Sequence, residues 1–232
     1  MLNGRSIFAG LVALACLGAA GCRGDSKEPS AASREAAAAT VPADPDAPPA
    51  RPRIVAFGDS LTIGLGLLEQ EAYPALLQNK INEAGYQFEV VNAGVSGDTS
   101  AGGLRRLDWS LDGDVRVLVV ELGGNDGLRG LPVTQMRSNL SAIIKESQSA
   151  GARVLLVGVR LPPNYGEVYT SAFEAAYREL AKTHRLALVP FILEDFAGNP
   201  EYFQADRLHP NEQAQQLMLD RVWSGLKPLL HR

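Results

Sequence analysis

Short apolar runs alternate with segments of helical period through most of the chain, and this alternation constrains the fold more than any other feature. Strands are predicted at 54–57, 89–92, 115–121, 154–159 and 187–190. Helices are predicted between and after them, at 73–84, 101–109, 133–150, 169–183 and 211–226. Strands that alternate with helices form parallel sheets covered on both faces. The prediction is therefore an α/β fold: a three-layer α/β/α sandwich with a five-stranded parallel sheet.

The first 22 residues have the pattern of an export signal. Arg5 precedes an apolar run at 7–20, which ends in small residues. The end of this run also resembles a bacterial lipobox, in which Cys22 would be lipidated and become the mature N-terminus. Ala19 stands where the usual leucine would be, so conventional cleavage near Ala20 is the alternative. The family rule for the residue after the cysteine, here Arg23, favours the outer membrane. We expect an exported, periplasmic or membrane-anchored protein.

Residues 23–52 are rich in alanine and proline and have no apolar periodicity, which predicts a disordered tether. The folded domain is expected at 53–232. The formal net charge of the chain is -4, without a dense Lys/Arg block, so nucleic acid is not an expected partner. Both cysteines, Cys16 and Cys22, precede the domain, which leaves it without thiols for disulfides, metal sites or nucleophilic catalysis.

Open parallel sheets bind ligands at the carboxyl ends of their strands, so the loops there are the candidate site. Ser60 follows the first strand, as a candidate nucleophile or an ordinary turn serine. After the second strand, the loop at 93–100 contains Gly97 and either presents backbone N–H groups to an anion or is a flexible turn capped by Thr99 or Ser100. After the third strand, Asn125 either aims its amide into the crevice or belongs to a structural turn.

The fourth loop, before the last helix, contains Asp206 and His209. A carboxylate three residues before a histidine on a turn can hold one ring nitrogen while the other faces outward, as a general base requires. His184 and His231 are interpreted as surface histidines. No second histidine or carboxylate pair stands at ligand spacing, so neither a metal nor another cofactor is expected.

Four sequence blocks together resemble the GDSL or SGNH hydrolases. They are Gly58-Asp59-Ser60-Leu61, the loop with Gly97, Gly123-Gly124-Asn125-Asp126 and Asp206-Arg207-Leu208-His209-Pro210. Strings at 96–100, 121–130 and 160–166 resemble the bacterial thioesterase, lysophospholipase and arylesterase subgroup. The resemblance implies a flavodoxin-like fold and roles for specific residues. Ser60 would be the nucleophile, His209 its base and Asp206 the carboxylate that orients the base. The oxyanion hole would be the Ser60 and Gly97 N–H groups and the Asn125 amide.

Asp59 is expected to fix the turn rather than to transfer protons. The serine does not lie in a Gly-x-Ser-x-Gly elbow, which argues against an α/β-hydrolase. The loop at 127–132 resembles a segment that closes over acyl chains, and we expect Leu128 and Leu131 to line an acyl pocket; a plain connector is the alternative.

The resulting hypothesis is a serine ester hydrolase acting on acyl esters, thioesters or lysophospholipids. A carbohydrate or peptidoglycan O-acetylesterase, or a non-catalytic lipoprotein that binds acylated ligands, are the alternatives.

Overall fold

The computed structural model describes residues 51–230, which belong to one compact unit, Pro49–Arg232. The export signal, Cys22 and nearly all of the expected tether lie outside the described residues. Within the described part, no helix has the length and apolar character needed to cross a membrane.

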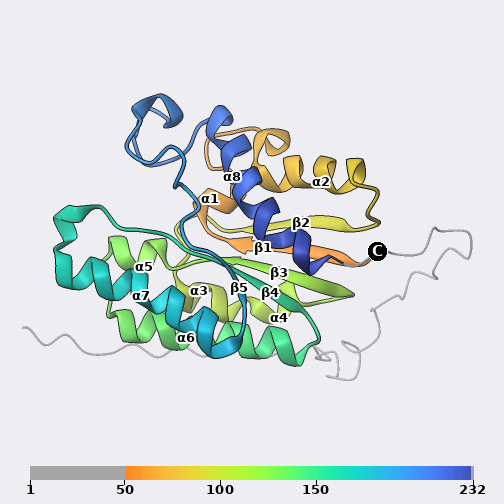
Figure 1. Cartoon of the computed structure of the whole chain (residues 1–232), viewed down its shortest axis with the longest axis horizontal. Coiled ribbons are helices and arrows are strands. Elements are labelled where there is room, and N and C mark those ends of the chain that lie inside the picture. The colour runs from red at the N-terminus through yellow and green to blue at the C-terminus, as the bar shows by residue number, and fades with distance from the viewer. Residues whose placement is uncertain (1–50, 231–232) are drawn as a thin grey trace, which may run out of the picture. The chain divides into compact units, whose positions relative to one another are not determined.

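The five predicted strands form one parallel sheet in the order β2-β1-β3-β4-β5 (Figure 1). Their bounds are β1 Arg53–Gly58, β2 Glu89–Gly94, β3 Val115–Glu121, β4 Arg153–Val157 and β5 Ala187–Val189. β4 and β5 end earlier than predicted, and Gly158 and Pro190 explain this. A side chain on Gly158 would lie 2.3 Å from the Pro190 carbonyl oxygen, and Pro190 has no N–H to continue the pairing.

Helices cover both faces of the sheet (Figure 1). Side chains alternate along each strand, so β1 points Ile54 and Ala56 to one face and Val55 and Phe57 to the other. The first face packs against α2 and α8; the second packs against α4, α6 and α7. The long helices are α2 Tyr73–Glu83, α6 Val133–Ser149, α7 Glu167–His184 and α8 Glu212–Leu226. The two faces bury separate apolar clusters, so the predicted three-layer α/β/α sandwich is confirmed.

The predicted helix at 101–109 is two helices, α3 Ser100–Arg105 and α4 Leu107–Ser110. Arg106 separates them with φ -108° and ψ 8°, outside helical geometry. Two glycines, Gly102 and Gly103, weaken the helix before the break. The break turns the Arg106 side chain back toward the sheet, where it forms the contacts described below.

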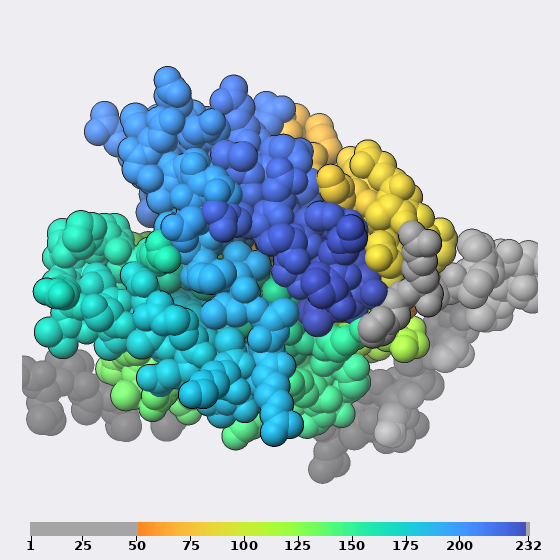
Figure 2. Space-filling view, viewed as in Figure 1, coloured from red at the N-terminus to blue at the C-terminus, as the bar shows by residue number. Residues whose placement is uncertain are grey.

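The loops that follow the strands converge at one edge of the sheet. Strand order reverses between β1 and β3, and in open α/β sheets this is where ligands bind. Two short helices begin there, α1 Ser60–Ile63 after β1 and α5 Gly124–Leu128 after β3. The segment between β5 and α8 extends beyond the same edge (Figures 1 and 2). The four blocks found in the sequence therefore meet at this edge.

Candidate active site

Ser60 is the first residue of α1, and its neighbours impose the sharp turn that exposes it. Asp59 caps α1, accepting a hydrogen bond from the Leu61 N–H to Oδ1 at 3.0 Å. A side chain on Gly58 would lie 2.7 Å from the Glu121 carbonyl oxygen, so only glycine allows this approach of β1 to β3. The turn thus projects the Ser60 hydroxyl over the end of the sheet.

His209 lies between Ser60 and Asp206. Its Nε2 is 3.0 Å from Ser60 Oγ, and its Nδ1 is 2.6 Å from Asp206 Oδ2. When Nδ1 carries the ring proton, it donates a hydrogen bond to Asp206. Nε2 is then free to accept a hydrogen bond from the serine hydroxyl. This hydrogen bond, followed by those from the His209 and Leu208 backbone N–H groups, lowers the Asp206 pKa to about 2. Asp206 is therefore an anion across the physiological range.

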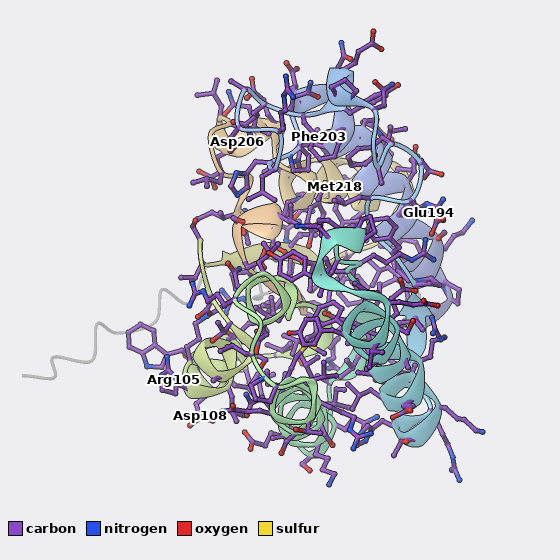
Figure 3. All side chains as sticks on the ribbon, turned by 90° about the vertical axis from the view of Figure 1, so that its left-hand side faces the viewer. Arg105, Asp108, Glu194, Phe203, Asp206 and Met218 are labelled. Atoms are coloured by element: carbon purple, nitrogen blue, oxygen red, sulfur yellow. The ribbon has the colours of Figure 1, made fainter. Side chains whose placement is uncertain are left out.

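The turn with Asp206 and His209 is held in place by its own backbone. Asp206 Oδ1 accepts from the backbone N–H groups of Leu208 and His209, each at 3.0 Å. Arg207, which follows Asp206 in this turn, adopts φ 58°, a conformation that non-glycine residues seldom adopt. Gln204 binds the turn to the loop after α1, donating to the Leu65 carbonyl at 2.7 Å. Asp206 and Phe203 both lie in the upper part of the view in Figure 3, in the segment between β5 and α8.

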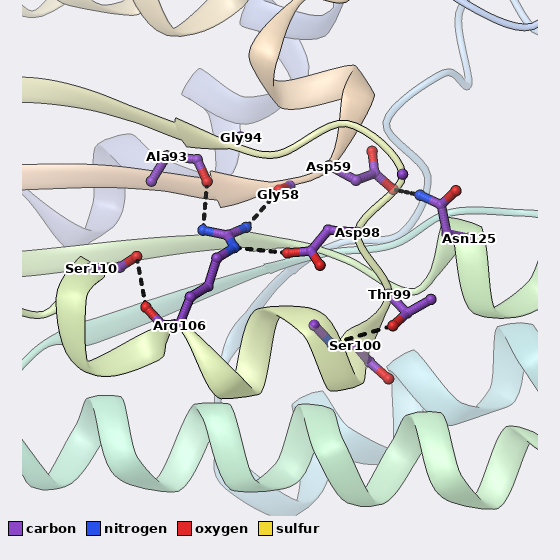
Figure 4. A network of polar contacts seen from close by, with 12 residues as sticks. Gly58, Asp59, Ala93, Gly94, Asp98, Thr99, Ser100, Arg106, Ser110 and Asn125 are labelled. Atoms are coloured by element: carbon purple, nitrogen blue, oxygen red, sulfur yellow. Dashed lines mark hydrogen bonds and ion pairs between the residues drawn. The ribbon is translucent and has the colours of Figure 1, made fainter. Parts of the chain in front are cut away.

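Three candidate anion donors line one cavity of about 680 Å³ together with His209. They are Ser60, Gly97 and Asn125. Gly97 has φ 78°, a conformation that favours glycine. Asn125 donates through Nδ2 to Asp59 Oδ2 at 2.9 Å (Figure 4). Each predicted residue of the triad and of the oxyanion hole is therefore at this one site.

The rest of the cavity wall is mostly apolar. Its apolar side chains include Leu128, Val159, Leu161, Phe191, Leu193 and Phe203. Leu131 is not among the lining residues; it is half-buried, and its carbonyl accepts from the Tyr169 hydroxyl at 2.7 Å. The sequence interpretation missed the wall supplied by the loops after β4 and β5. The signal was available, because those loops follow strands as the first three blocks do.

Arg106 joins the two strand ends that precede Ser60 and Gly97 (Figure 4). It donates to Asp98 Oδ2 at 2.7 Å, to the Ala93 carbonyl at 2.8 Å and to the Gly58 carbonyl at 2.9 Å. The guanidinium also lies 4.1 Å from the centre of the Phe57 ring. Nothing in the local sequence pattern singled out this arginine, since its partners are up to 48 residues away.

A second network joins the Gly97 loop to α5. The Ser100 N–H and hydroxyl donate to the two oxygens of buried Asp126, at 2.7 and 2.6 Å. The Asn139 amide donates in turn to the Ser100 hydroxyl at 3.0 Å. Thr99 is the helix cap of α3, as one of the two interpretations of this loop expected. Asp126 thereby ties the segment after Gly97 to the residue next to Asn125.

Two buried acids lie beneath the serine. Asp59 is 3% exposed and Glu121 is fully buried. Burial raises the Asp59 pKa to about 6, and burial together with the Asp59 charge raises the Glu121 pKa well above its ordinary value. Asp59 does fix the turn, as expected. Glu121 was not singled out from the sequence, where it reads as the end of an apolar strand.

His184 lies away from this site. Its Nε2 is 2.9 Å from the Ser141 hydroxyl, and burial lowers its pKa. It lines a separate groove of about 710 Å³ between α6 and α7, and most of the residues that line this groove are of polar or charged types. His231 lies outside the described residues.

Comparisons with known proteins agree with this geometry. Residues 56–217 match the model of the GDSL-like Lipase/Acylhydrolase family. The chain is 47% identical over 178 residues to esterase TesA of Pseudomonas aeruginosa, covering 76% of this chain and 89% of that protein. It is 41% identical over 179 residues to thioesterase 1/protease 1/lysophospholipase L1 of Escherichia coli K12, covering 77% and 85%.

Among solved structures, the crystal structure of TesA superposes with a TM-score of 0.75 at 46% identity, covering 77% of this chain and 99% of that one. On the match over 56–217 and on these relatives, the chain belongs to the GDSL-like lipase/acylhydrolase family.

Proposed function

We propose that this protein is a serine ester hydrolase that cleaves carboxyl esters and thioesters through an acyl-enzyme on Ser60. The observation that carries the proposal is the continuous contact from Asp206 through His209 to Ser60, at 2.6 and 3.0 Å. A serine, an imidazole and a carboxylate in this order are the requirements for nucleophilic catalysis of acyl transfer. Relatives named as an esterase and as a thioesterase and lysophospholipase support the same reaction class.

In the first half of the reaction, Ser60 Oγ attacks the acyl carbon while His209 Nε2 takes the hydroxyl proton. The carbonyl oxygen becomes an oxyanion, which accepts from the N–H groups of Ser60 and Gly97 and from the Asn125 amide. The tetrahedral intermediate collapses when the bond to the leaving group breaks and His209 protonates that group. The acyl group is then an ester of Ser60.

In the second half, water replaces the leaving group. His209 removes a proton from the water as it attacks the acyl carbon, and the same oxyanion donors hold the second tetrahedral intermediate. Its collapse returns the proton to Ser60 Oγ and releases the carboxylic acid. Asp206 remains ionised throughout and keeps the imidazole in its productive tautomer.

A fluorophosphonate probe tests the nucleophile. It should label the wild type and not Ser60→Ala, whereas Ser96→Ala, which changes another serine of the same cavity, should still be labelled. Hydrolysis of a nitrophenyl ester should fall by about 10⁴–10⁶ in Ser60→Ala and by about 10²–10³ in Asn125→Ala. Labelling of folded Ser60→Ala would refute the assignment and favour a different nucleophile. A folded wild type that neither reacts nor turns over would support the non-catalytic alternative.

The acyl chain is proposed to lie along the apolar wall that includes Leu128. A substrate series from acetyl to palmitoyl esters tests this, with Leu131→Ala as the matched control for Leu128→Ala. Leu128→Ala should lower kcat/KM for octanoyl esters more than for acetyl esters, because its side chain lines the cavity. Equal profiles for both variants and the wild type would remove Leu128 from the acyl site. Much faster cleavage of acetyl esters would favour the O-acetylesterase alternative.

We further propose that the protein is exported and that Cys22 carries a lipid, so that the domain at 53–232 acts at a membrane surface. The support is the sequence pattern of residues 1–22 and the composition of 23–52. Mass spectrometry of the mature N-terminus tests it. A diacylated Cys22 is expected, and an unmodified terminus near Gly21 would contradict lipidation.

A further inference from the structure

The buried acid Glu121 has no part in the reaction described above, yet it lies directly below the residues that perform it. It is the last residue of β3 and pairs in register with Gly58, two residues before Ser60. Its side chain is fully buried and is not part of the cavity wall, so it does not meet the substrate. A fully buried carboxyl requires compensating hydrogen bonds.

Only one oxygen of Glu121 has such a bond. Oε2 accepts from the Thr62 hydroxyl at 2.9 Å, and that hydroxyl also contacts the Tyr73 hydroxyl at 3.2 Å. Oε1 has no hydrogen-bond partner among residues 51–230. Buried polar atoms rarely remain without a partner, so this oxygen requires an explanation.

The neighbouring Asp59 carboxyl explains why Glu121 Oε1 has no other partner in the described part of the chain. Asp59 directly follows Gly58, the residue that pairs with Glu121 in the sheet, and it caps the helix whose Thr62 donates to Glu121 Oε2. In this arrangement a hydrogen bond between the two carboxyls acts on the pKa of each. Two ionised carboxylates cannot form that bond, because both only accept. One proton between them turns the repulsion of two buried anions into a hydrogen bond.

The proton belongs on Glu121 rather than on Asp59. Asp59 already accepts from the Leu61 N–H and from Asn125 Nδ2, both of which favour its ionised form, and His209 is nearby. For Glu121, complete burial and the neighbouring Asp59 charge raise the pKa, and they outweigh the Thr62 hydroxyl of α1 and the nearby Asp59 backbone N–H, which favour the charged form. The hydroxyls of Tyr73 of α2 and Tyr177 of α7 also lie near it, and neither is a cation that could compensate a charge.

We propose that Glu121 is a positioning residue: its carboxyl stays protonated at neutral pH, donates to the Asp59 carboxylate and thereby fixes the Asn125 amide. An ionised Asp59 can only accept, so Asn125 must turn its NH₂ group toward it (Figure 4). That orientation leaves the second hydrogen of the same NH₂ group for the oxyanion. A protonated Asp59 could instead donate to the amide oxygen, and a reversed amide would place the wrong atoms at the site.

Two substitutions separate this role from a purely structural one. Glu121→Gln keeps a donor for Asp59 and an acceptor for Thr62, and its kcat should stay within about threefold of the wild type. Glu121→Met keeps the length but removes both functions, and its kcat should fall by about 10²-fold with little change in KM, because a misplaced oxyanion donor acts on the transition state. This inference rests on the proposed function, so both variants are compared with Ser60→Ala.

Infrared spectroscopy gives a readout that does not depend on activity. The carbonyl stretch of a protonated carboxyl should be present near neutral pH in the wild type and in Ser60→Ala, and absent in Glu121→Gln. No such band in the wild type would overturn the proposal, as would wild-type kcat in Glu121→Met. Folded Glu121→Gln with a kcat as low as that of Glu121→Met would also overturn it. If Glu121→Met does not fold, the infrared band of the wild type and the kcat of Glu121→Gln still test the proposal. Activity in Ser60→Ala would instead overturn the proposed function.

Discussion

Replacing Arg106 by methionine should destabilise the protein far more than the loss of an ordinary surface ion pair. Methionine keeps an unbranched apolar side chain at this position but removes the guanidinium, which lies over the Phe57 ring and whose three hydrogen bonds join Asp98 to the ends of β1 and β2. The pair is largely shielded from solvent, with side chains 21% exposed for Arg106 and 14% for Asp98. Removing the cation leaves Asp98 and two carbonyl groups without this donor.

The magnitude follows from these contacts. The bond to Asp98 is charge-assisted and contributes about 1.5–3 kcal/mol, and each bond to a carbonyl about 1 kcal/mol. The position over Phe57 adds about 0.5–1 kcal/mol. Because the methionine stem retains part of the packing, we expect the free energy of unfolding to fall by about 3–5 kcal/mol. For a domain of this size that corresponds to a Tm lower by roughly 10 °C.

Urea unfolding followed by circular dichroism measures the change, with Arg137→Met as the matched control. Arg137 pairs with Glu179 at 2.7 Å, but both side chains are about half exposed. Exposed pairs contribute only about 0.2–1 kcal/mol. Arg106→Lys should recover only part of the loss, since one ammonium cannot reproduce the planar fork. If Arg106→Met lost no more than Arg137→Met, the inference that this network fixes the Ser60 and Gly97 loops would be refuted.

Two further predictions concern packing and pH. Gly127→Ala should lower the free energy of unfolding by about 1–3 kcal/mol in the same assay, because its methyl group would lie 2.5 Å from Leu161 Cδ2; an unchanged value would mean that this contact relaxes freely. Asp206→Asn should lower kcat by about 10⁴. The Asp206 pKa of about 2 lies below its ordinary 3.8, so the stabilisation it gives is present above pH 4 and lost between about pH 4 and 2. The Tm difference between wild type and Asp206→Asn should therefore shrink over that range; a constant difference would contradict the linkage.

The parts of the site that the sequence predicted are those that a local pattern determines. A buried parallel strand is a continuous apolar run, and the residue that follows it must lie at the carboxyl edge of the sheet. That reasoning applies to Ser60, Gly97 and Asn125, each placed by the strand before it. It was not applied to the apolar wall after β4 and β5, because the residues that line the cavity there, such as Leu161 and Phe191, are apolar and have no catalytic group.

The residues that support the site, Arg106 and Glu121, cannot be found in this way, because their roles depend on partners far away in the sequence. Arg106 lies inside a segment of helical period, and its role becomes visible only from its contacts with Gly58 and Ala93. Glu121 is the last residue of an apolar strand, and in the sequence an acidic residue at that position indicates only that the strand ends there. In the fold it is buried against another acid 62 positions earlier, Asp59, and a proton is needed to reconcile the two. The nucleophile can be proposed from the four sequence blocks together, whereas the groups that orient its oxyanion donors become visible only when the strand ends are brought together in the fold.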